Sequence, residues 1–507
     1  MPTQPQILDA LDTEHLHADL KGRSVRGVSL TLISQGTRFV LQLASTMVLA
    51  RLLTPAEFGL VAMVTAITAL ANAFQDLGLS EATIQRQKIS HDQVSTLFWI
   101  NVAVGLGLTL IMASLAPMLA WFYREERLRD ITFLLSLTFL FSGLTVQHGA
   151  LLRRQMRFVA LGIRDVASYA LAVPVALILA WRGFGYWAIV AVPLIANFNR
   201  MALSWMMCRW IPSLPRRNAN VGSMVAFGGN IAASYMLLNV MRNADSVLIG
   251  RYLGAGPLGL YSRAYNLVMQ PMRQLFDPVG SVAIPAFSRL QGDPERFAHY
   301  YLRTINLLTW VSASILGILF VAAEPVTLLV LGNKWREAAP VFQILNISTF
   351  AQLLQWSTIW LFVSQGKSGR LLRQSLITSP IVIAGYLIGL RFGIKGVALS
   401  ASMIQLGILP WILNYSFQGT HLTLRRVGQA ILYPISLSLA GVAVAEIALH
   451  LLTPQRIASQ LLVVTVAFGV AYLLSGLIPS VREEVRSLRK ILSEMRFRRQ
   501  AVQEIQT

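Results

Sequence analysis

The sequence predicts an all-α polytopic membrane protein of about 14 transmembrane helices. We expect two six-helix lobes related by a parallel pseudo-two-fold repeat, followed by two C-terminal helices. Composition, recurring apolar stretches and an internal repeat all support this fold class. Of the 507 residues, 55% are hydrophobic and only 13% are charged, whereas about a quarter of a soluble domain is charged. With a mean hydropathy of +0.57, this composition excludes a disordered chain and an ordinary soluble enzyme.

Stretches of about 20 apolar residues, long enough to cross a bilayer as a helix, recur along the chain. The expected spans are 29–51, 57–80, 96–120, 130–151, 163–181, 185–208, 222–249, 258–287, 300–323, 338–364, 372–390, 394–417, 428–451 and 458–479. They predict six domains or segments: 1–28, a cytoplasmic N-terminal segment; 29–208, the N-lobe; 209–221, a cytoplasmic inter-lobe loop; 222–417, the C-lobe; 418–480, two additional spans; and 481–507, a basic cytoplasmic tail.

The first 20 residues are polar and acidic rather than basic and then apolar, so we expect no cleaved signal peptide. The first span would then act as an uncleaved insertion signal. The basic tail is predicted to be a helix, either lying on the inner leaflet or solvated in the cytoplasm.

Positive charge indicates the orientation of the chain. The net charge is +20, and the cations lie between apolar runs rather than on one basic face, so we expect no nucleic acid partner. With an even number of spans and a cytoplasmic N-terminus, 25 Lys and Arg fall in inside segments and 11 in outside segments. By the positive-inside rule, both termini are predicted to be cytoplasmic.

The sequence contains nothing that indicates a catalytic centre. Every predicted loop is too short for a catalytic domain, and no His, Cys, Asp or Glu cluster has metal-ligand spacing. We therefore expect no enzyme, no cofactor and no metal. The lone cysteine, Cys208, lies in an apolar run and is expected to be packed.

An internal repeat relates the two halves at an offset of 200 residues. Segment 45–61 aligns without a gap on 245–261. The identical pairs are Arg51 and Arg251, Leu53 and Leu253, Gly59 and Gly259, and Leu60 and Leu260. Each segment ends the first span of its half and opens the second. Such parallel pseudo-symmetry is typical of transporters whose substrate sits between two lobes that rock around it.

Three spans carry polar residues at helical spacing, which places each set on one helix face. We expect these faces to line a basic cavity for an anionic substrate; the alternative is interhelix hydrogen bonding that locks the bundle. The candidate substrate-binding residues are Arg38, Gln42, Asn239, Arg242, Arg263, Asn266, Gln270 and Arg273. The other arginines within spans are Arg164, Arg200 and Arg303.

Acids within the spans are fewer. Asp245 lies three residues from Arg242, and Asp277 lies four from Arg273, which is within ion-pair reach on a helix. Two interpretations stay open: charge neutralisation, or a proton or sodium site for cation coupling. Asp165, next to Arg164 near a span end, is expected to be interfacial.

Several segments resemble one family. They are ARLLTPAEFG (50–59), QDLGLSEATIQR (75–86), GRYLGAGPLGLYSRA (250–264), GNKWREAAPVFQIL (332–345) and GIKGVALSAS (393–402). They are similar to the Wzx-type flippases, the polysaccharide-exporter branch of the multidrug/oligosaccharidyl-lipid/polysaccharide flippase superfamily. The resemblance runs from about residue 21 to 480.

The resemblance implies two six-helix lobes in a bacterial inner (plasma) membrane and a basic central cavity. The implied substrate is a polyprenyl-diphosphate-linked oligosaccharide, moved from the cytoplasmic to the periplasmic leaflet for exopolysaccharide, capsule or O-antigen (lipopolysaccharide) synthesis. Membrane lipids, a proton or sodium ion, and polysaccharide polymerase or export machinery are the other implied partners. The alternative is a cation-coupled drug antiporter of the same superfamily, in which acids rather than arginines would dominate the cavity.

Overall fold

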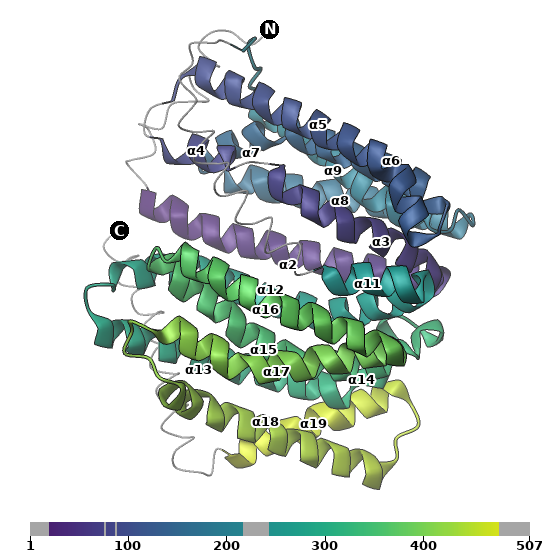
Figure 1. The fold of residues 1–507 in the computed structure, drawn as a ribbon, viewed down its shortest axis with the longest axis vertical. Coiled ribbons are helices and arrows are strands. Elements are labelled where there is room, and N and C mark those ends of the chain that lie inside the picture. Colours follow the sequence, from purple (N-terminus) through teal and green to yellow (C-terminus); the bar gives the residue numbers. More distant parts are fainter. Residues whose placement is uncertain (1–19, 76–77, 87–88, 216–242, 476–507) are drawn as a thin grey trace. The chain divides into compact units, whose positions relative to one another are not determined.

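The computed structural model describes residues 20–75, 78–86, 89–215 and 243–475, and these residues form helices and turns without any strand (Figure 1). Eight of their helical stretches are long and apolar enough to cross a membrane. The fold is therefore all-helical, as predicted. The count of 14 spans stays a prediction, and the predicted span 222–249 lies mostly outside the described residues.

The chain divides into two compact units. The first comprises residues up to Arg263 together with Val330–Trp335 and Ile383–Val397. Its helices are α2 (Leu20–Leu52), α3 (Pro55–Ala71), η2 (Asn72–Phe74), α4 (Leu79–Gln85), α5 (His91–Tyr123), α6 (Arg127–Gly143), α7 (Val146–Arg154), α8 (Phe158–Trp181), α9 (Trp187–Cys208), α11 (Ala244–Leu253), the start of α12 (Ala255–Arg289), η3 (Asn333–Trp335) and η4 (Leu390–Phe392). The lobe bounds predicted from the sequence stay predictions.

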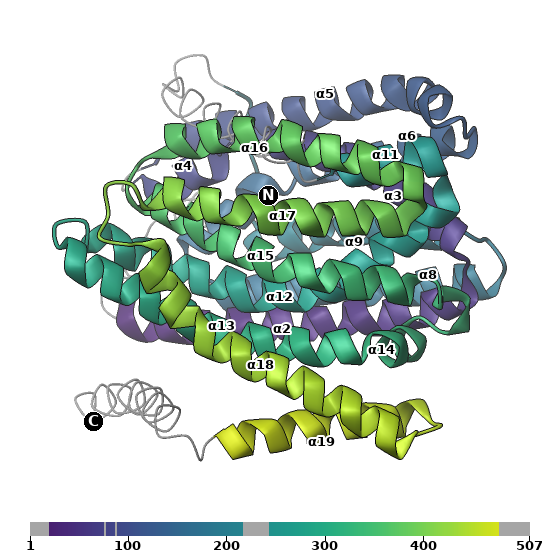
Figure 2. The same ribbon diagram turned by 60° about the horizontal axis from the view of Figure 1, so that its bottom comes forward.

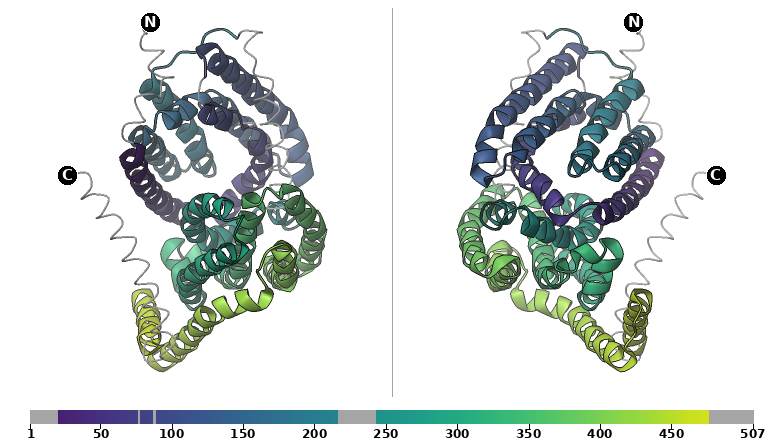
Figure 3. Two further views of the ribbon diagram at one scale, coloured as in Figure 1. Left: turned by 90° about the vertical axis from the view of Figure 1, so that its left-hand side faces the viewer. Right: turned by 90° about the vertical axis from the view of Figure 1, so that its right-hand side faces the viewer.

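In the first unit, α2 packs on α8, α8 on α9, α9 on α6 and α6 on α5. Figure 3 shows these helices nearly end-on, as members of one bundle. Predicted span 57–80 differs from the structure, because α3 ends at Ala71 and Gly78 (φ 65°) begins the separate helix α4. Likewise, span 130–151 is divided into α6 and α7.

The second unit holds the rest of the chain. Its helices are the remainder of α12, α13 (Pro294–Val321), α14 (Ala323–Val330) up to Leu329, α15 (Ala338–Ser364), α16 (Ser368–Gly389) up to Val382, α17 (Gly393–Phe417) from Ala398, α18 (Leu424–Leu452) and α19 (Ile457–Ser475). The end of α16 and the start of α17 belong to the first unit. α18 packs along α13, and α19 returns along α18 (Figure 2). Phe468 and Val464 of α19 join Val321 and Ala445 in a buried apolar cluster at this end of the unit.

Local sequence signals explain where α3 begins. Thr54 accepts a hydrogen bond from the Glu57 backbone N–H, and the Glu57 carboxylate accepts from the Thr54 backbone N–H at 2.7 Å. This reciprocal capping box satisfies two backbone donors that the helix leaves unpaired. Pro55 occupies the first turn, where its missing N–H costs nothing. The turn between α2 and α3 is thus fixed by its own residues.

Within the first unit, the repeat brings two glycines into reciprocal contact. A Cβ on Gly59 would stand 1.7 Å from the carbonyl oxygen of Ala255, and a Cβ on Gly259 would stand 1.8 Å from that of Pro55. Both distances are far below van der Waals contact, so only glycine permits the first turns of α3 and α12 to approach this closely. Residues 55 and 255, and 59 and 259, are repeat equivalents. The structure therefore places equivalent residues around a local two-fold, as the repeat predicts.

Candidate functional site

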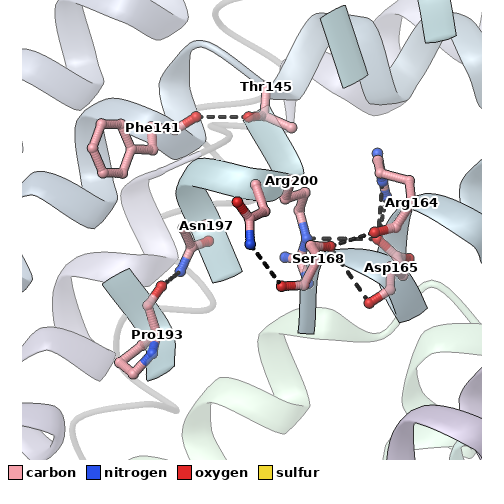
Figure 4. Close-up of polar contacts among 9 residues, drawn as sticks. Phe141, Thr145, Arg164, Asp165, Ser168, Pro193, Asn197 and Arg200 are labelled. Atoms are coloured by element: carbon pink, nitrogen blue, oxygen red, sulfur yellow. Dashed lines mark hydrogen bonds and ion pairs between the residues drawn. The ribbon is translucent and has the colours of Figure 1, made fainter. Parts of the chain in front are cut away.

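In the first unit, two arginines, one on α8 and one on α9, form ion pairs with the same aspartate (Figure 4). Arg164 Nη2 lies 2.8 Å from Asp165 Oδ1, and Arg200 Nε lies 3.5 Å from the same oxygen. The side chains of Arg164, Asp165 and Arg200 are 12%, 33% and 30% exposed. One carboxylate therefore serves two arginines within apolar helices.

Arg38 of α2 adds a third positive charge to this group. Its charge and that of Arg164 repel the charge of Arg200, whereas Asp165 attracts it. Two turns further along the same helix, Ser45 Oγ lies 3.0 Å from the hydroxyl of Tyr169 on α8. The contact ties the polar face of α2 to the α8 face that carries Asp165, because residues four apart in a helix share a face.

Arg263 of α12 is the fourth arginine of this region. Its guanidinium carbon lies 4.9 Å from the centroid of the Phe58 ring. Its Nε is shielded from solvent and has no hydrogen-bond partner among the described residues. Tyr169, which contacts α2, also interacts electrostatically with Arg263. We name Arg38, Arg164, Arg200 and Arg263, together with Asp165, the arginine cluster.

The cluster has more positive charge than its own carboxylate can balance. Among the described residues, Asp165 is the one carboxylate that pairs with these arginines, and it contacts Arg164 and Arg200. Uncompensated charge among membrane-spanning helices is costly, and arginine is suited to bidentate recognition of phosphate and carboxylate groups. The arrangement is chemically suited to hold an anion with several oxygens.

The remaining candidate residues lie outside the arginine cluster and differ in their position and exposure. Gln42 is half-buried on α2, one turn before Ser45. Asn239 and Arg242 lie outside the described residues. Four others occupy the part of α12 in the second unit: Asn266 and Gln270 are half-buried, and Arg273 and Asp277 are exposed. The Arg273 guanidinium lies 5.9 Å from the Trp356 ring centroid.

Asp245 is held by local hydrogen bonds at the start of α11. It is buried, with 6% exposure; its Oδ1 accepts from the Ser246 backbone N–H at 2.6 Å, and its Oδ2 accepts from the Tyr261 hydroxyl at 3.0 Å. Both carboxylate oxygens are thus engaged within the first unit. Its predicted neighbour Arg242 is not described, so cation coupling stays a prediction. Among the described residues, no group of three His, Cys, Asp or Glu could hold a metal ion.

Sequence reasoning found Arg38 and Arg263 but gave no site role to Arg164, Asp165 and Arg200. A signal was present in α8 and α9. Asp165 and Tyr169 are four residues apart, and Asn197, Arg200 and Ser204 follow a 3-4 spacing. These polar runs are shorter than the one in α2. The sharing of Asp165 by two helices is a tertiary contact that periodicity does not encode.

Comparison with known proteins identifies the family. The model of the family described as polysaccharide biosynthesis protein matches residues 48–340. The teichuronic acid biosynthesis protein TuaB of Bacillus subtilis (strain 168) is 26% identical over 424 residues, which cover 82% of this chain and 86% of TuaB. The lipopolysaccharide biosynthesis protein WzxC of Escherichia coli (strain K12) is 25% identical over 334 residues, 65% of this chain and 67% of WzxC.

Among solved structures, the lipid II flippase MurJ in an inward closed conformation is similar, with a TM-score of 0.72. The similarity covers 88% of this chain and 98% of MurJ at 11% sequence identity, and it shows the fold alone. The sequence matches and the all-helical architecture agree with the resemblance found in the sequence. The chain therefore belongs to the polysaccharide biosynthesis protein family and, within it, to the Wzx-type flippases, which are multi-pass membrane transporters.

Proposed function

We propose that this protein moves a polyprenyl-diphosphate-linked oligosaccharide repeat unit from the cytoplasmic to the periplasmic leaflet. The product would serve exopolysaccharide, capsule or O-antigen synthesis. The observation that carries the proposal is the arginine cluster. In it, Asp165 pairs with Arg164 and Arg200, while Arg38, a neighbour of Arg200, and Arg263, over Phe58, have no carboxylate partner among the described residues. A diphosphate would supply the missing negative charge.

The chemistry of the substrate sets what the protein must provide. Each sugar hydroxyl costs several kcal/mol, roughly, when it enters hydrocarbon without a hydrogen-bond partner, and the charged diphosphate costs more. The polyprenyl tail needs no shelter and stays in the lipid. The protein therefore has to enclose the head group alone, with charged donors for the phosphates and neutral polar groups for the sugar.

The candidate residues divide in the same way. In this proposal the arginines of the cluster, with Arg242 and Arg273, bind the diphosphate during the cycle. Gln42, Asn239, Asn266 and Gln270 hydrogen-bond the sugar hydroxyls. Alternating access of two lobes moves the head group across. Asp277, which is exposed on α12, is the acid better placed than Asp245 to exchange a cation with water.

Leaflet exchange in proteoliposomes tests the proposal. A fluorescent polyprenyl-diphosphate oligosaccharide would be followed with and without a proton gradient, for the native protein, Arg200→Gln and the control Arg303→Gln. Arg303 is an exposed arginine of α13, outside the cluster. Removing one charge-assisted hydrogen-bond donor costs about 1.5–3 kcal/mol, so we expect Arg200→Gln to slow exchange about 10–100-fold and Arg303→Gln to leave it close to native.

Two outcomes would contradict the proposal. One is equal exchange by Arg200→Gln and the native protein, with both variants monodisperse in size-exclusion chromatography. The other is extrusion of a cationic dye without any lipid exchange, which would favour the drug antiporter. A response of exchange to the proton gradient would establish cation coupling.

A further inference from the structure

The GNKW segment, residues 332–335, contacts the helices of the first unit. It lies between α14 and α15, yet Val330–Trp335 belongs to the first compact unit. The indole Nε1 of Trp335 donates to the carbonyl oxygen of Ala50 at 2.8 Å. Lys334 Nζ donates to the carbonyl oxygens of Arg51 at 3.2 Å and Leu52 at 3.4 Å. These three carbonyls are the last of α2, so the segment caps that helix end.

The same segment packs against the aromatic residue that lies under Arg263. The buried Trp335 ring meets the Phe58 ring edge to face, with centroids 5.2 Å apart and an interplanar angle of 80°. Phe58 is 3% exposed, and the Arg263 guanidinium carbon lies 4.9 Å from its centroid. A chain of contacts thus runs from the end of α2 through Trp335 and Phe58 to Arg263.

Arg370 in the second unit shows how an arginine that stabilises the fold differs from Arg263. Its guanidinium also lies over an aromatic ring, 4.7 Å from the centroid of Tyr415. It donates to the carbonyl oxygens of Tyr415 and Gln418 and to the side chain of Gln418, at 2.5–2.9 Å. Arg263 has the aromatic contact, but its shielded Nε has no partner among the described residues. Buried polar groups are normally hydrogen-bonded, so this donor is available to a ligand.

We infer that Phe58 and Trp335 are positioning residues of the anion site. Trp335 fixes the Phe58 ring, and the ring holds the Arg263 guanidinium so that its in-plane N–H groups stay free for phosphate oxygens. A guanidinium that stacks on a ring contacts the ring with its flat face. Its N–H donors point outward in the guanidinium plane and stay unoccupied. A guanidinium held in place before binding loses less side-chain entropy when the ligand arrives. This inference rests on the proposed function.

The inference assigns a role to a motif that the flippase proposal alone does not explain. GNKW contributes no side chain to the arginine cluster. It acts through Phe58 and through the end of α2, the helix that carries Arg38 and Gln42. Both effects hold the binding groups in one geometry without contact to the substrate.

Binding of geranylgeranyl diphosphate to the full-length protein in detergent, measured by isothermal titration, tests this role. Arg263→Gln should raise Kd about 10–100-fold through loss of a charge-assisted donor. Phe58→Leu keeps an apolar side chain but removes the ring face, and should raise Kd about 3–10-fold. Phe58→Tyr keeps the ring face, so its Kd should equal that of the native protein. Trp335→Phe, which keeps a ring but loses the bond to Ala50, should raise Kd about twofold to threefold.

A matched control and a double mutant separate positioning from stability. Phe122 lies under Arg251, at 5.6 Å from the guanidinium carbon, outside the arginine cluster, so Phe122→Leu should leave Kd unchanged. In an Arg263→Gln background, Phe58→Leu should have no further effect, because the group that it positions is gone. This non-additivity is the expected signature. This double-mutant test does not use a Trp335 variant, so it still applies if the Trp335 variants fail to fold.

Four results would overturn the inference. Phe58→Leu could weaken binding equally with and without Arg263, or lower the unfolding temperature without changing Kd; either would make Phe58 purely structural. Alternatively, Arg263→Gln could bind as the native protein does while Arg200→Gln binds weakly. The inference would then fail, whereas the proposed function would stand. If neither arginine matters, both fail.

Discussion

The two compact units bury different kinds of polar side chain. The first unit buries Arg154 and Asp245, at 8% and 6% exposure, and half-buries the arginine cluster. In the described part of the second unit, no Asp, Glu, Lys, Arg or His side chain is buried, and the buried polar groups belong to neutral residues such as Ser357 and the Tyr301 hydroxyl that it contacts. Ion pairs among its described residues are surface contacts, in which each partner's side chain is 46–76% exposed.

The difference has a physical reason. Serine and threonine satisfy themselves by bonding back to their own helix, as Ser348 and Thr349 do to the Leu345 carbonyl oxygen. They need no outside partner. An arginine inside a membrane helix does need one, and such residues in general mark binding sites or ion pathways. The contrast therefore teaches that the first unit buries charged side chains among its helices, whereas the described core of the second is packed with apolar and neutral polar side chains.

The largest expected effect comes from removing the only carboxylate of the arginine cluster. Asp165→Asn leaves Arg164 and Arg200 without their counter-ion. After allowance for partial exposure, it should cost about 1–3 kcal/mol of the free energy of unfolding. It should also tighten diphosphate binding, because the cluster becomes more positive. Thermal unfolding and titration on the same sample measure both changes.

The matched control for that variant lies in the second unit. Glu324 pairs with Arg336 at 3.1 Å with both side chains more than half exposed, so Glu324→Gln should change the free energy of unfolding by less than about 0.5 kcal/mol. If Asp165→Asn and Glu324→Gln lower the free energy of unfolding equally, the ion pairs of the two units do not differ in their contribution to stability.

An intermediate effect is expected at Asp245. Asp245→Asn keeps the size of the side chain but weakens the acceptor for the Tyr261 hydroxyl, and should cost about 1–2 kcal/mol of the free energy of unfolding. Tyr261→Phe should reproduce most of this loss, since it removes the same bond. Denaturant unfolding measures both. Loss of the response to a proton gradient at unchanged stability would instead make Asp245 a cation site.

The smallest effect concerns a surface contact of the second unit and depends on pH. The Glu295 carboxylate accepts from His421 and lies 3.6 Å from Arg426, and these partners lower the pKa of Glu295. Because its pKa is lowered on folding, the carboxylate stabilises the α17–α18 loop above the ordinary Glu pKa. That contribution is lost as the pH falls through the lowered value.

Limited proteolysis of the α17–α18 loop should therefore distinguish the native protein from Glu295→Gln at pH 7, with faster cleavage of the variant. The difference should vanish once the pH falls well below about 4, near the ordinary pKa of glutamate. A difference that persists at pH 3 would show that Glu295 acts by some means other than its charge.

Hydropathy was sufficient to predict the fold class, because a helix that crosses a membrane needs about 20 predominantly apolar residues. The offset-200 alignment also predicted that Gly59 and Gly259 are equivalent, and the structure brings them together. Polar residues that repeat along one helix named Arg38 and Arg263 of the cluster as candidates, and their role in binding stays a prediction. The pairing of Asp165 with Arg200, and the contact of Phe58 with Trp335, join residues far apart in sequence and leave no periodic signal.

The reciprocal glycine contact also bears on how the chain arose. If a half-length ancestor once paired as a symmetric homodimer, this contact would have lain on its axis, with each subunit's glycine against the other's backbone. A single β-carbon there would then have clashed twice, so one substitution would have carried a double penalty. Fusion of two such copies into one chain would separate the two positions and let each mutate alone. In the present chain Gly59 still meets the carbonyl oxygen of Ala255, and Gly259 that of Pro55.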